Sequence, residues 1–231
     1  MSFSIEWDEN YRDNKHLTLW PMSALIKYVM RYAKPKGHGF RVLELGCGPG
    51  GNIPFFKSLG VKYYSVEGSP FIVDKIKERF PDLGKNIACG DFTESLPFNG
   101  YFDVIVDRAS LTHNTTAAIT RCLDNVYKKL KPGGRFIGID WFSRTHSDSK
   151  IGDSLEGDRY SKTNIKKGHL SGVGVVHFSD KQHLLRLFKR FHMEVMEHKM
   201  TITELPGKGH VFAAWDFVAV KGHARTRKSR A

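Results

Sequence analysis

The feature that most constrains the fold is a short apolar strand that runs directly into a glycine-rich turn. Residues 40–45 read as a buried β-strand, and four glycines follow between positions 46 and 51. Glycine lacks a Cβ, so such a turn can bring the backbone close to a ligand. A nucleoside triphosphate loop would end in Gly-Lys-Ser/Thr, whereas Gly51-Asn52 follows here, so triphosphate binding is disfavoured. The G-x-G-x-x-G spacing alone leaves a nicotinamide or flavin enzyme open.

Apolar periodicity alternates between strand and helix along the rest of the chain. Strands are predicted at 40–45, 62–67, 85–91, 102–108, 134–142, 191–202 and 210–222, and helices at 18–33, 69–80, 115–134 and 179–191. The last two strands are joined by a turn and must therefore be antiparallel. We expect an α/β fold with a doubly wound, seven-stranded, mostly parallel sheet and a C-terminal antiparallel strand pair.

Three segments lie outside this pattern. Residues 1–36 are expected to form an N-terminal helical lid on a single domain that spans 1–223. Residues 143–176 are rich in Gly, Ser, Asp and Lys without clear periodicity, so we expect a loop-like insert on the substrate side. Residues 224–231 form a basic tail that we expect to be disordered.

The composition limits the class of protein. The net charge of +12 makes an anionic substrate or a polyanionic partner plausible, and five of the positive charges lie in the last eleven residues. Three separated cysteines argue against a disulfide framework and a zinc cluster. No apolar run approaches the roughly 20 residues of a membrane span, and the first residues lack a secretory pattern, so we expect a cytoplasmic protein.

The predicted sheet brings polar residues together at its carboxyl edge. In a doubly wound sheet, ligands bind beyond the carboxyl ends of the strands. Five stretches meet there: 44–52, 67–69, 90–92, 107–113 and 140–142. A carboxylate at Glu44, two residues before the first glycine, would repel a pyrophosphate and attract a cationic ligand.

These stretches resemble the ordered motifs of class I S-adenosylmethionine-dependent methyltransferases. The matching segments are LELGCGPGGN (43–52), YYSVEGS (63–69), CGDF (89–92), FDVIVDRAS (102–110) and LKPGGRFI (130–137). The resemblance covers residues 40–139 and implies a Rossmann-like fold with S-adenosyl-L-methionine as the cofactor.

The resemblance also implies a set of cofactor contacts. Glu44 would receive the amino end, Glu67 both ribose hydroxyls and Asp91 the adenine amino group. Phe92 would stack near the adenine, and Asp107 with Arg108 would close the methionine side. The complete predicted set is Glu44, Gly46, Cys47, Gly48, Gly50, Asn52, Glu67, Gly68, Ser69, Asp91, Phe92, Asp107 and Arg108. Three of these residues could instead have a purely structural role. Ser69 could cap a helix, Phe92 could belong to the hydrophobic core, and Cys47 could be a small residue in the turn.

Few side chains are candidates for catalysis. His113 is the best-placed general base, and the alternative is a helix-start histidine that faces solvent or bonds a backbone group. Arg108 would bind an anionic acceptor or pair with an acid. No metal is expected, because Asp140 is followed by Trp141 rather than by the Asn of catechol-type enzymes. Acceptor contacts are expected from Tyr11, His16, Trp20, Trp141 and Tyr160.

The leading hypothesis is therefore methyl transfer to an oxygen or nitrogen of a small, sugar-like or anionic acceptor. An RNA or protein methyltransferase is the alternative, because the chain is basic, although DRAS at 107–110 differs from the pattern of base-amino methylases. A regulator that binds the cofactor without catalysis is a third class.

Overall fold

The computed structural model describes residues 4–206 and 209–222. Within them, seven strands form one sheet in the order β3-β2-β1-β4-β5-β10-β9, which confirms the predicted architecture. The strands are β1 (Arg41–Leu45), β2 (Lys62–Glu67), β3 (Ile87–Cys89), β4 (Phe102–Arg108), β5 (Leu130–Phe142), β9 (Phe191–Thr203) and β10 (His210–Lys221). β1 to β5 are parallel, and β10 runs antiparallel to both β5 and β9.

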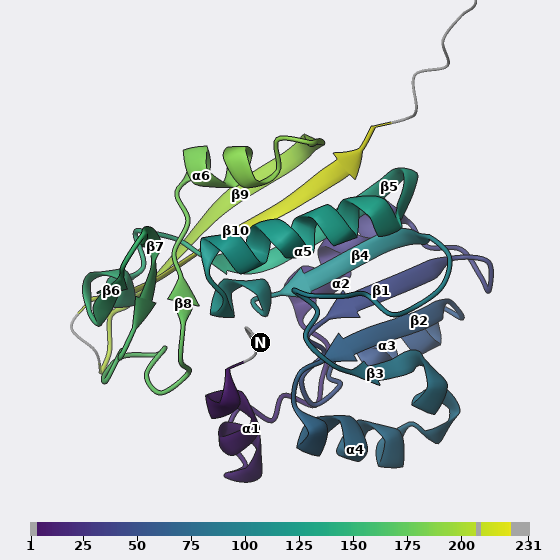
Figure 1. Ribbon diagram of the computed structural model, residues 1–231, viewed down its shortest axis with the longest axis horizontal. Helices are drawn as coiled ribbons and strands as arrows, with labels where there is room; N and C mark the ends of the chain where they lie inside the picture. Colours follow the sequence, from purple (N-terminus) through teal and green to yellow (C-terminus); the bar gives the residue numbers. More distant parts are fainter. Residues whose placement is uncertain (1–3, 207–208, 223–231) are drawn as a thin grey trace, which may run out of the picture.

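Helices cover both faces of this sheet. They are α1 (Ile5–Arg12), α2 (Ser23–Tyr28), α3 (Ile53–Ser58), α4 (Pro70–Arg79), α5 (Thr116–Lys129) and α6 (Lys181–Leu187). Figure 1 shows α5 across the front of the sheet and α2 and α3 behind it. The two faces of β1 explain this layering, because Val42 packs in one apolar cluster with α2, α3 and α4, whereas Leu43 and Leu45 pack in another with α5 and α6.

Local sequence signals fix where the helices begin. The Ser69 hydroxyl accepts a hydrogen bond from the backbone N–H of Ile72 at 3.1 Å, which caps α4. The start of α6 differs from the expected capping box at Ser179 and Gln182. Asp180 is the cap instead, and its carboxylate accepts from the backbone N–H of His183 at 2.7 Å.

The insert at 143–176 is more ordered than its sequence predicts. It contains the helical turn η4 (Ser147–Lys150). β6 (Asp153–Leu155), β7 (Asp158–Thr163) and β8 (Val176–His177) form a second, three-stranded sheet in which β7 pairs with both of the others. The strands are short and polar, so they lack the apolar alternation that reveals a strand in sequence. Figure 1 shows this small sheet beyond the carboxyl ends of β1 and β4, on the same side as α1.

No helix among residues 4–206 and 209–222 is long and apolar enough to cross a membrane. The predicted basic tail at 224–231 lies outside the described residues.

Candidate active site

A cavity of about 300 Å³ lies at the carboxyl ends of the parallel strands. Its walls come from three parts of the chain that are distant in sequence: the strand ends, the N-terminal segment and the insert. β1 lies between β2 and β4, so the order in which successive strands are added to the sheet reverses at β1. This is the position at which doubly wound sheets bind ligands.

The glycine-rich turn forms the floor of the cavity at the end of β1. Gly46, Gly48 and Gly50 have φ values of +63°, +50° and +80°, which side chains rarely adopt. A Cβ on Gly46 would also overlap the side chain of Ser110. Gly46 and Gly48 line the cavity, whereas Gly50 does not and packs on Ile53. The backbone conformation and the packing on Ile53, rather than the approach of a ligand, therefore explain why position 50 is a glycine.

Glu67 ends β2 as a buried carboxylate on the cavity wall. One carboxylate oxygen accepts from the backbone N–H of Gly48 at 2.9 Å, and the other accepts from the backbone N–H of Ser69 at 3.0 Å. Burial raises the pKa of Glu67, and these backbone hydrogen bonds oppose that effect. Because a carboxylate has about four acceptor positions, both oxygens retain capacity for the hydroxyls of a diol.

Glu44 is held more tightly than Glu67. Its two oxygens accept from the Asn52 side chain at 2.7 Å and from the Tyr63 hydroxyl at 2.6 Å. Burial raises its pKa to about 7. Asn52 also accepts from the backbone N–H of Met22 at 3.2 Å, so it links this carboxylate to the N-terminal segment.

The predicted adenine contacts line the cavity beyond β3. Asp91 and Phe92 are both part of its wall, beside Gly68 and Gly90. One carboxylate oxygen of Asp91 accepts from the backbone N–H of Thr93 at 2.8 Å, which orients the side chain. Nothing in the protein lies within 4 Å of where a Cβ on Gly90 would stand, so this wall leaves open space beside Asp91.

The ends of β4 and β5 carry an ion network. Arg108 lines the cavity, and its Nε donates to Asp140 at 3.1 Å. Lys199 reaches the same carboxylate at 2.9 Å and also Asp216 at 2.7 Å. Asp140 itself has a φ of +56°, a strained conformation for a residue other than glycine, and such strain is frequent at functional sites.

Asp107 lies outside the cavity lining, unlike Arg108 beside it. The Asp107 side chain is fully buried and accepts from the backbone N–H of Leu111 at 2.9 Å. Burial raises its pKa to about 7. Asp107 therefore supports the turn after β4, and we no longer propose it as a direct cofactor contact.

His113 is buried in the cavity wall, with its ring edge-on to Trp7 and Phe142. Its Nδ1 lies 3.3 Å from the carbonyl oxygen of Val175. A carbonyl can only accept, so Nδ1 carries the proton and Nε2 keeps a lone pair. Burial lowers the pKa of His113 to about 4, so the ring is neutral near pH 7.

The N-terminal segment covers the cavity as a roof. Tyr11, His16 and Trp20, which the sequence analysis names as expected acceptor contacts, all line the cavity, and Trp7 does so as well. The roof also meets the insert directly, because the Asn10 side chain donates to the carbonyl of Gly172 at 3.0 Å.

Three predicted site residues lie elsewhere. Trp141 is fully buried, packing against Phe136 and Phe217, and Tyr160 stacks on His183 at a centroid distance of 3.5 Å. Ser69 caps α4 and donates to Asp8. None of the three lines the cavity, so we no longer propose them as ligand contacts.

Sequence reasoning placed residues 140–142 at this edge of the sheet, but it missed the wall residues that the insert and β10 contribute. The wall from the end of β5, the insert and β10 consists of Asp140, Phe142, His169, Leu170, Val173 and Phe212. The insert contributes His169, Leu170 and Val173, and no periodic pattern in its sequence predicts that these residues meet β5 and β10.

The site suits one kind of cofactor. Glu44 at one strand end fits a cationic amino group, Glu67 at the next fits a ribose diol, and Asp91 with Phe92 fits an adenine. The fold and the site together resemble those of class I S-adenosylmethionine-dependent methyltransferases, whose cofactor this site would accept.

Comparisons with known proteins agree with this class. The family model described as "Methyltransferase domain" matches residues 42–134, so this part of the chain is a methyltransferase domain. An uncharacterized methyltransferase of Synechocystis sp. is 29% identical over 103 residues, which cover 44% of this chain and 47% of that protein. A protein-L-isoaspartate O-methyltransferase of Chlorobium limicola is 32% identical over 103 residues, or 42% of each chain.

The chain therefore spans less than half the length of these two curated relatives. Among solved structures, an S-adenosylmethionine-dependent methyltransferase of Methanosarcina mazei has a TM-score of 0.65 and 17% identity. That alignment covers 89% of this chain and all of the other, and at this identity it supports the fold.

Proposed function

We propose that this protein transfers the methyl group of S-adenosylmethionine to an oxygen or nitrogen atom of a small-molecule acceptor. One observation supports a small molecule as the acceptor: the N-terminal roof and the insert both lie over the cavity. The N-terminal roof contacts the insert through Asn10 and Gly172, and both segments line the cavity. The roof and the insert narrow the approach to the cavity, which favours a metabolite over a folded macromolecule as the acceptor.

The cofactor supplies a methyl group that its sulfonium already activates, so the protein's task is to align the acceptor and exclude water. His113 would accept the proton of a hydroxyl or ammonium acceptor at Nε2. Its hydrogen bond to the Val175 carbonyl holds the required tautomer. Arg108 would orient an anionic or hydroxylated acceptor, because Asp140 engages its Nε and the guanidinium lies on the cavity wall.

A protein carboxylate is the second candidate acceptor. It is favoured by the names of the curated relatives, several of which are protein-L-isoaspartate O-methyltransferases. A carboxylate needs no general base, because it is already ionised near pH 7. This alternative therefore makes His113 dispensable for the chemical step.

An acceptor screen with radiolabelled S-adenosylmethionine tests the proposal. The full-length chain would be incubated with pooled hydroxylated and anionic metabolites, with an isoaspartyl peptide and with bulk RNA. Label transferred only to a metabolite pool supports the proposal. Label transferred to the peptide or the RNA instead contradicts the small-molecule assignment, and the absence of transfer to any acceptor supports a non-catalytic regulator.

A further inference from the structure

The acceptor side of the cavity is lined mainly by apolar and aromatic side chains. These lining residues are Trp7, Ala109, Phe142, Leu170, Val173 and Phe212. All six belong to one apolar cluster or pack against it, and the strand ends, the insert, the roof and β10 all contribute to that cluster. A sugar would press several hydroxyls against such a surface without hydrogen-bond partners, which is unfavourable. The part of the acceptor that meets this side should therefore be apolar.

Five rings on this side follow one another in contact. Trp7 lies edge-on to His113, with ring centroids 4.7 Å apart, and contacts His16 at 5.1 Å. His113 lies edge-on to Phe142 at 5.7 Å, and Phe142 lies edge-on to Phe212 at 6.4 Å. Burial lowers the pKa of both histidines, so all five rings are uncharged near pH 7. This aromatic wall can pack against a planar ring at the centroid distances of about 4.5–7 Å that aromatic pairs prefer.

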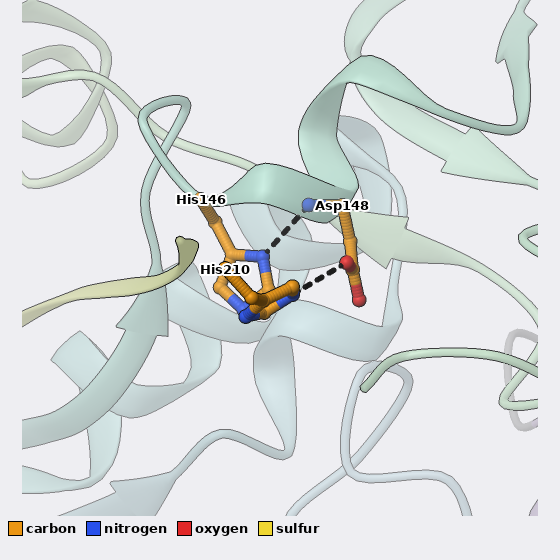
Figure 2. Close-up of side chains that lie close together, drawn as sticks. All are labelled: His146, Asp148 and His210. Atoms are coloured by element: carbon orange, nitrogen blue, oxygen red, sulfur yellow. Dashed lines mark hydrogen bonds and ion pairs between the residues drawn. The ribbon is translucent and has the colours of Figure 1, made fainter. Parts of the chain in front are cut away.

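The aromatic wall is supported from the protein interior. His146 packs edge-on against Phe142 at a centroid distance of 5.9 Å and against Phe212 at 5.3 Å. Next to it, the Asp148 carboxylate accepts from Nε2 of His210 at 2.9 Å, and Figure 2 shows these three polar residues together. None of the three lines the cavity. They hold the two phenylalanines from behind, so this part of the site is formed before a ligand arrives.

Arg108 offers free hydrogen-bond donors on the same side of the cavity. Its Nε donates to Asp140 at 3.1 Å, and the side chain is 38% exposed. In the described part of the chain, its two terminal nitrogens have no hydrogen-bond partner. Lys199 also binds Asp140, at 2.9 Å, so that carboxylate does not depend on the arginine alone. The planar end of a guanidinium suits a carboxylate, which it can bind through two parallel hydrogen bonds.

We propose that the acceptor is a small aromatic acid, a phenol whose ring packs on the aromatic wall and whose carboxylate pairs with Arg108. This inference rests on the proposed function and narrows its acceptor class. It disfavours the sugar-like acceptors that the sequence leaves open.

A phenol also matches the candidate base. Burial lowers the pKa of His113 to about 4, so the ring is a weak base. The pKa of a phenol is about 10, whereas that of water is about 15.7 and aliphatic hydroxyls hold their protons similarly. In the transfer, the phenol oxygen bonds to the methyl carbon and its proton moves to Nε2 of His113 and then to solvent. The electron pair of the broken S–CH₃ bond stays on sulfur, which yields S-adenosylhomocysteine.

Calorimetry on the full-length protein saturated with S-adenosylhomocysteine tests the two contacts separately. The ligands are benzoate, benzamide and cyclohexanecarboxylate, which lack the phenolic hydroxyl. Benzoate should bind at least about 10-fold more tightly than benzamide, because only benzoate carries a charge for Arg108. Benzoate should also bind several-fold more tightly than cyclohexanecarboxylate, which has the charge but no aromatic ring.

Arg108→Gln should remove the preference for benzoate over benzamide. Asp140 keeps Lys199 as its partner in this variant, so no carboxylate is left unpaired. Arg190→Gln is the matched control, because Arg190 also donates to an aspartate but lies outside the cavity. It should bind all three ligands as the wild type does.

Phe212→Leu should bring the affinities for benzoate and cyclohexanecarboxylate to within about 2-fold of each other, because the aromatic contact is lost while an apolar side chain remains. Phe98→Leu is the matched control. Phe98 is also partly buried, and it packs on Tyr64 outside the cavity. This control should keep the preference for benzoate.

Three binding results would overturn the proposal. The first is equal affinity of the wild type for benzoate and cyclohexanecarboxylate, and the second is equal affinity for benzoate and benzamide, no binding of benzoate included. The third is an Arg108→Gln variant that binds benzoate normally but S-adenosylhomocysteine poorly, because the arginine would then serve the cofactor.

A methyl-transfer assay with the hydroxybenzoates separates this proposal from the proposed function. Label on a hydroxybenzoate supports both. Label on sugars or hydroxycyclohexanecarboxylates alone overturns the aromatic acid and leaves the small-molecule function standing. Label on an isoaspartyl peptide or on RNA alone overturns the small-molecule function itself.

Discussion

The hydroxyl of Tyr11 lies 3.0 Å from the point at which a side chain on Gly48 would begin. This contact joins the N-terminal helix α1 to the glycine-rich turn after β1, although 37 positions separate the two residues. Gly48 also donates its N–H to Glu67. The roof, the floor and the carboxylate that would hold the ribose are therefore one connected unit.

Gly48→Ala should weaken cofactor binding through this unit. A Cβ would press on the Tyr11 hydroxyl, and alanine at a φ of +50° would strain the turn by about 1–2 kcal/mol. Gly157→Ala is the matched control, because Gly157 also has a positive φ of +73° but has nothing within 4 Å of its Cβ position and lies outside the cavity. Calorimetry with S-adenosylhomocysteine should show weaker binding only for Gly48→Ala. Equal affinities in the two variants would contradict this role of the turn.

Glu67→Gln should reduce affinity for S-adenosylhomocysteine by roughly 10- to 150-fold, since hydrogen bonds to a charged group contribute about 1.5–3 kcal/mol. The amide would also place N–H groups toward one of the two backbone donors, Gly48 and Ser69. Glu78→Gln, on the exposed side of α4, serves as the control. Unchanged affinity in Glu67→Gln would remove Glu67 from the cofactor site.

The sequence predicted the sheet, and it placed the candidate cofactor residues at one edge of that sheet, because both predictions depend on local patterns. Glu44 and Glu67 lie at the ends of strands, and Asp91 and Phe92 follow the end of another, and the apolar residues of these strands make them recognisable in the sequence. A parallel sheet then brings those strand ends together whatever the loops between them do. The same reasoning placed Trp141 wrongly, because a residue at the carboxyl end of a strand can point to either face of the sheet. Trp141 points into the core, in one apolar cluster with Leu184 of α6.

The acceptor half was less predictable because it depends on tertiary pairing. The insert forms its small sheet from β6, β7 and β8, whose strands have few apolar residues. Its cluster with Phe142 consists of Ile165, Leu170, Val173 and Val176, spaced without helical or strand periodicity. His146 and His210 meet only because β10 begins beside the insert, and no pattern in the sequence predicts that contact.

Cofactor affinity should depend on pH through Glu44. Burial raises its pKa to about 7, so the carboxylate is protonated below that pH and charged above it. The amino group of S-adenosylhomocysteine prefers the charged form, so its dissociation constant should rise toward 10-fold per pH unit as pH falls below 7. Glu44→Gln, which carries no charge at any pH, should flatten this dependence between pH 5.5 and 8. A wild-type profile without a slope would contradict the assignment.

The ligand-free protein should respond to pH in the opposite direction. The unfolded chain ionises Glu44 near its ordinary value of 4.5, whereas the folded chain does so near 7. The stability from this group is therefore complete below about pH 4.5 and is lost as pH rises through 7. Melting temperatures of the wild type and Glu44→Gln should diverge across this range, and parallel curves would contradict the shifted pKa.

His113→Ala should lower turnover by at least about 100-fold if the acceptor carries a proton that must leave. Affinity for S-adenosylhomocysteine should stay unchanged. Because burial lowers the pKa of His113 to about 4, the wild-type rate should show no step near pH 6.5 from this ring. His192→Ala controls for loss of a histidine at the surface. Unaltered turnover in His113→Ala would favour a carboxylate acceptor that needs no base.

Trp141→Phe should affect stability and not binding. The side chain is fully buried among Phe136, Phe188 and Phe217, so the smaller ring leaves a cavity and lowers the free energy of unfolding by about 1–3 kcal/mol. Chemical denaturation measures this loss, and calorimetry checks the affinity. A variant with normal stability and weakened acceptor binding would restore Trp141 as a contact.

Calorimetric titration of the full-length protein with S-adenosylmethionine is the most direct test of the site formed by Glu44, Glu67 and Asp91. We predict one molecule bound per chain, displaced by S-adenosylhomocysteine and weakened in Glu67→Gln. Binding of NAD or ATP in its place, with no heat from S-adenosylmethionine, would contradict the account.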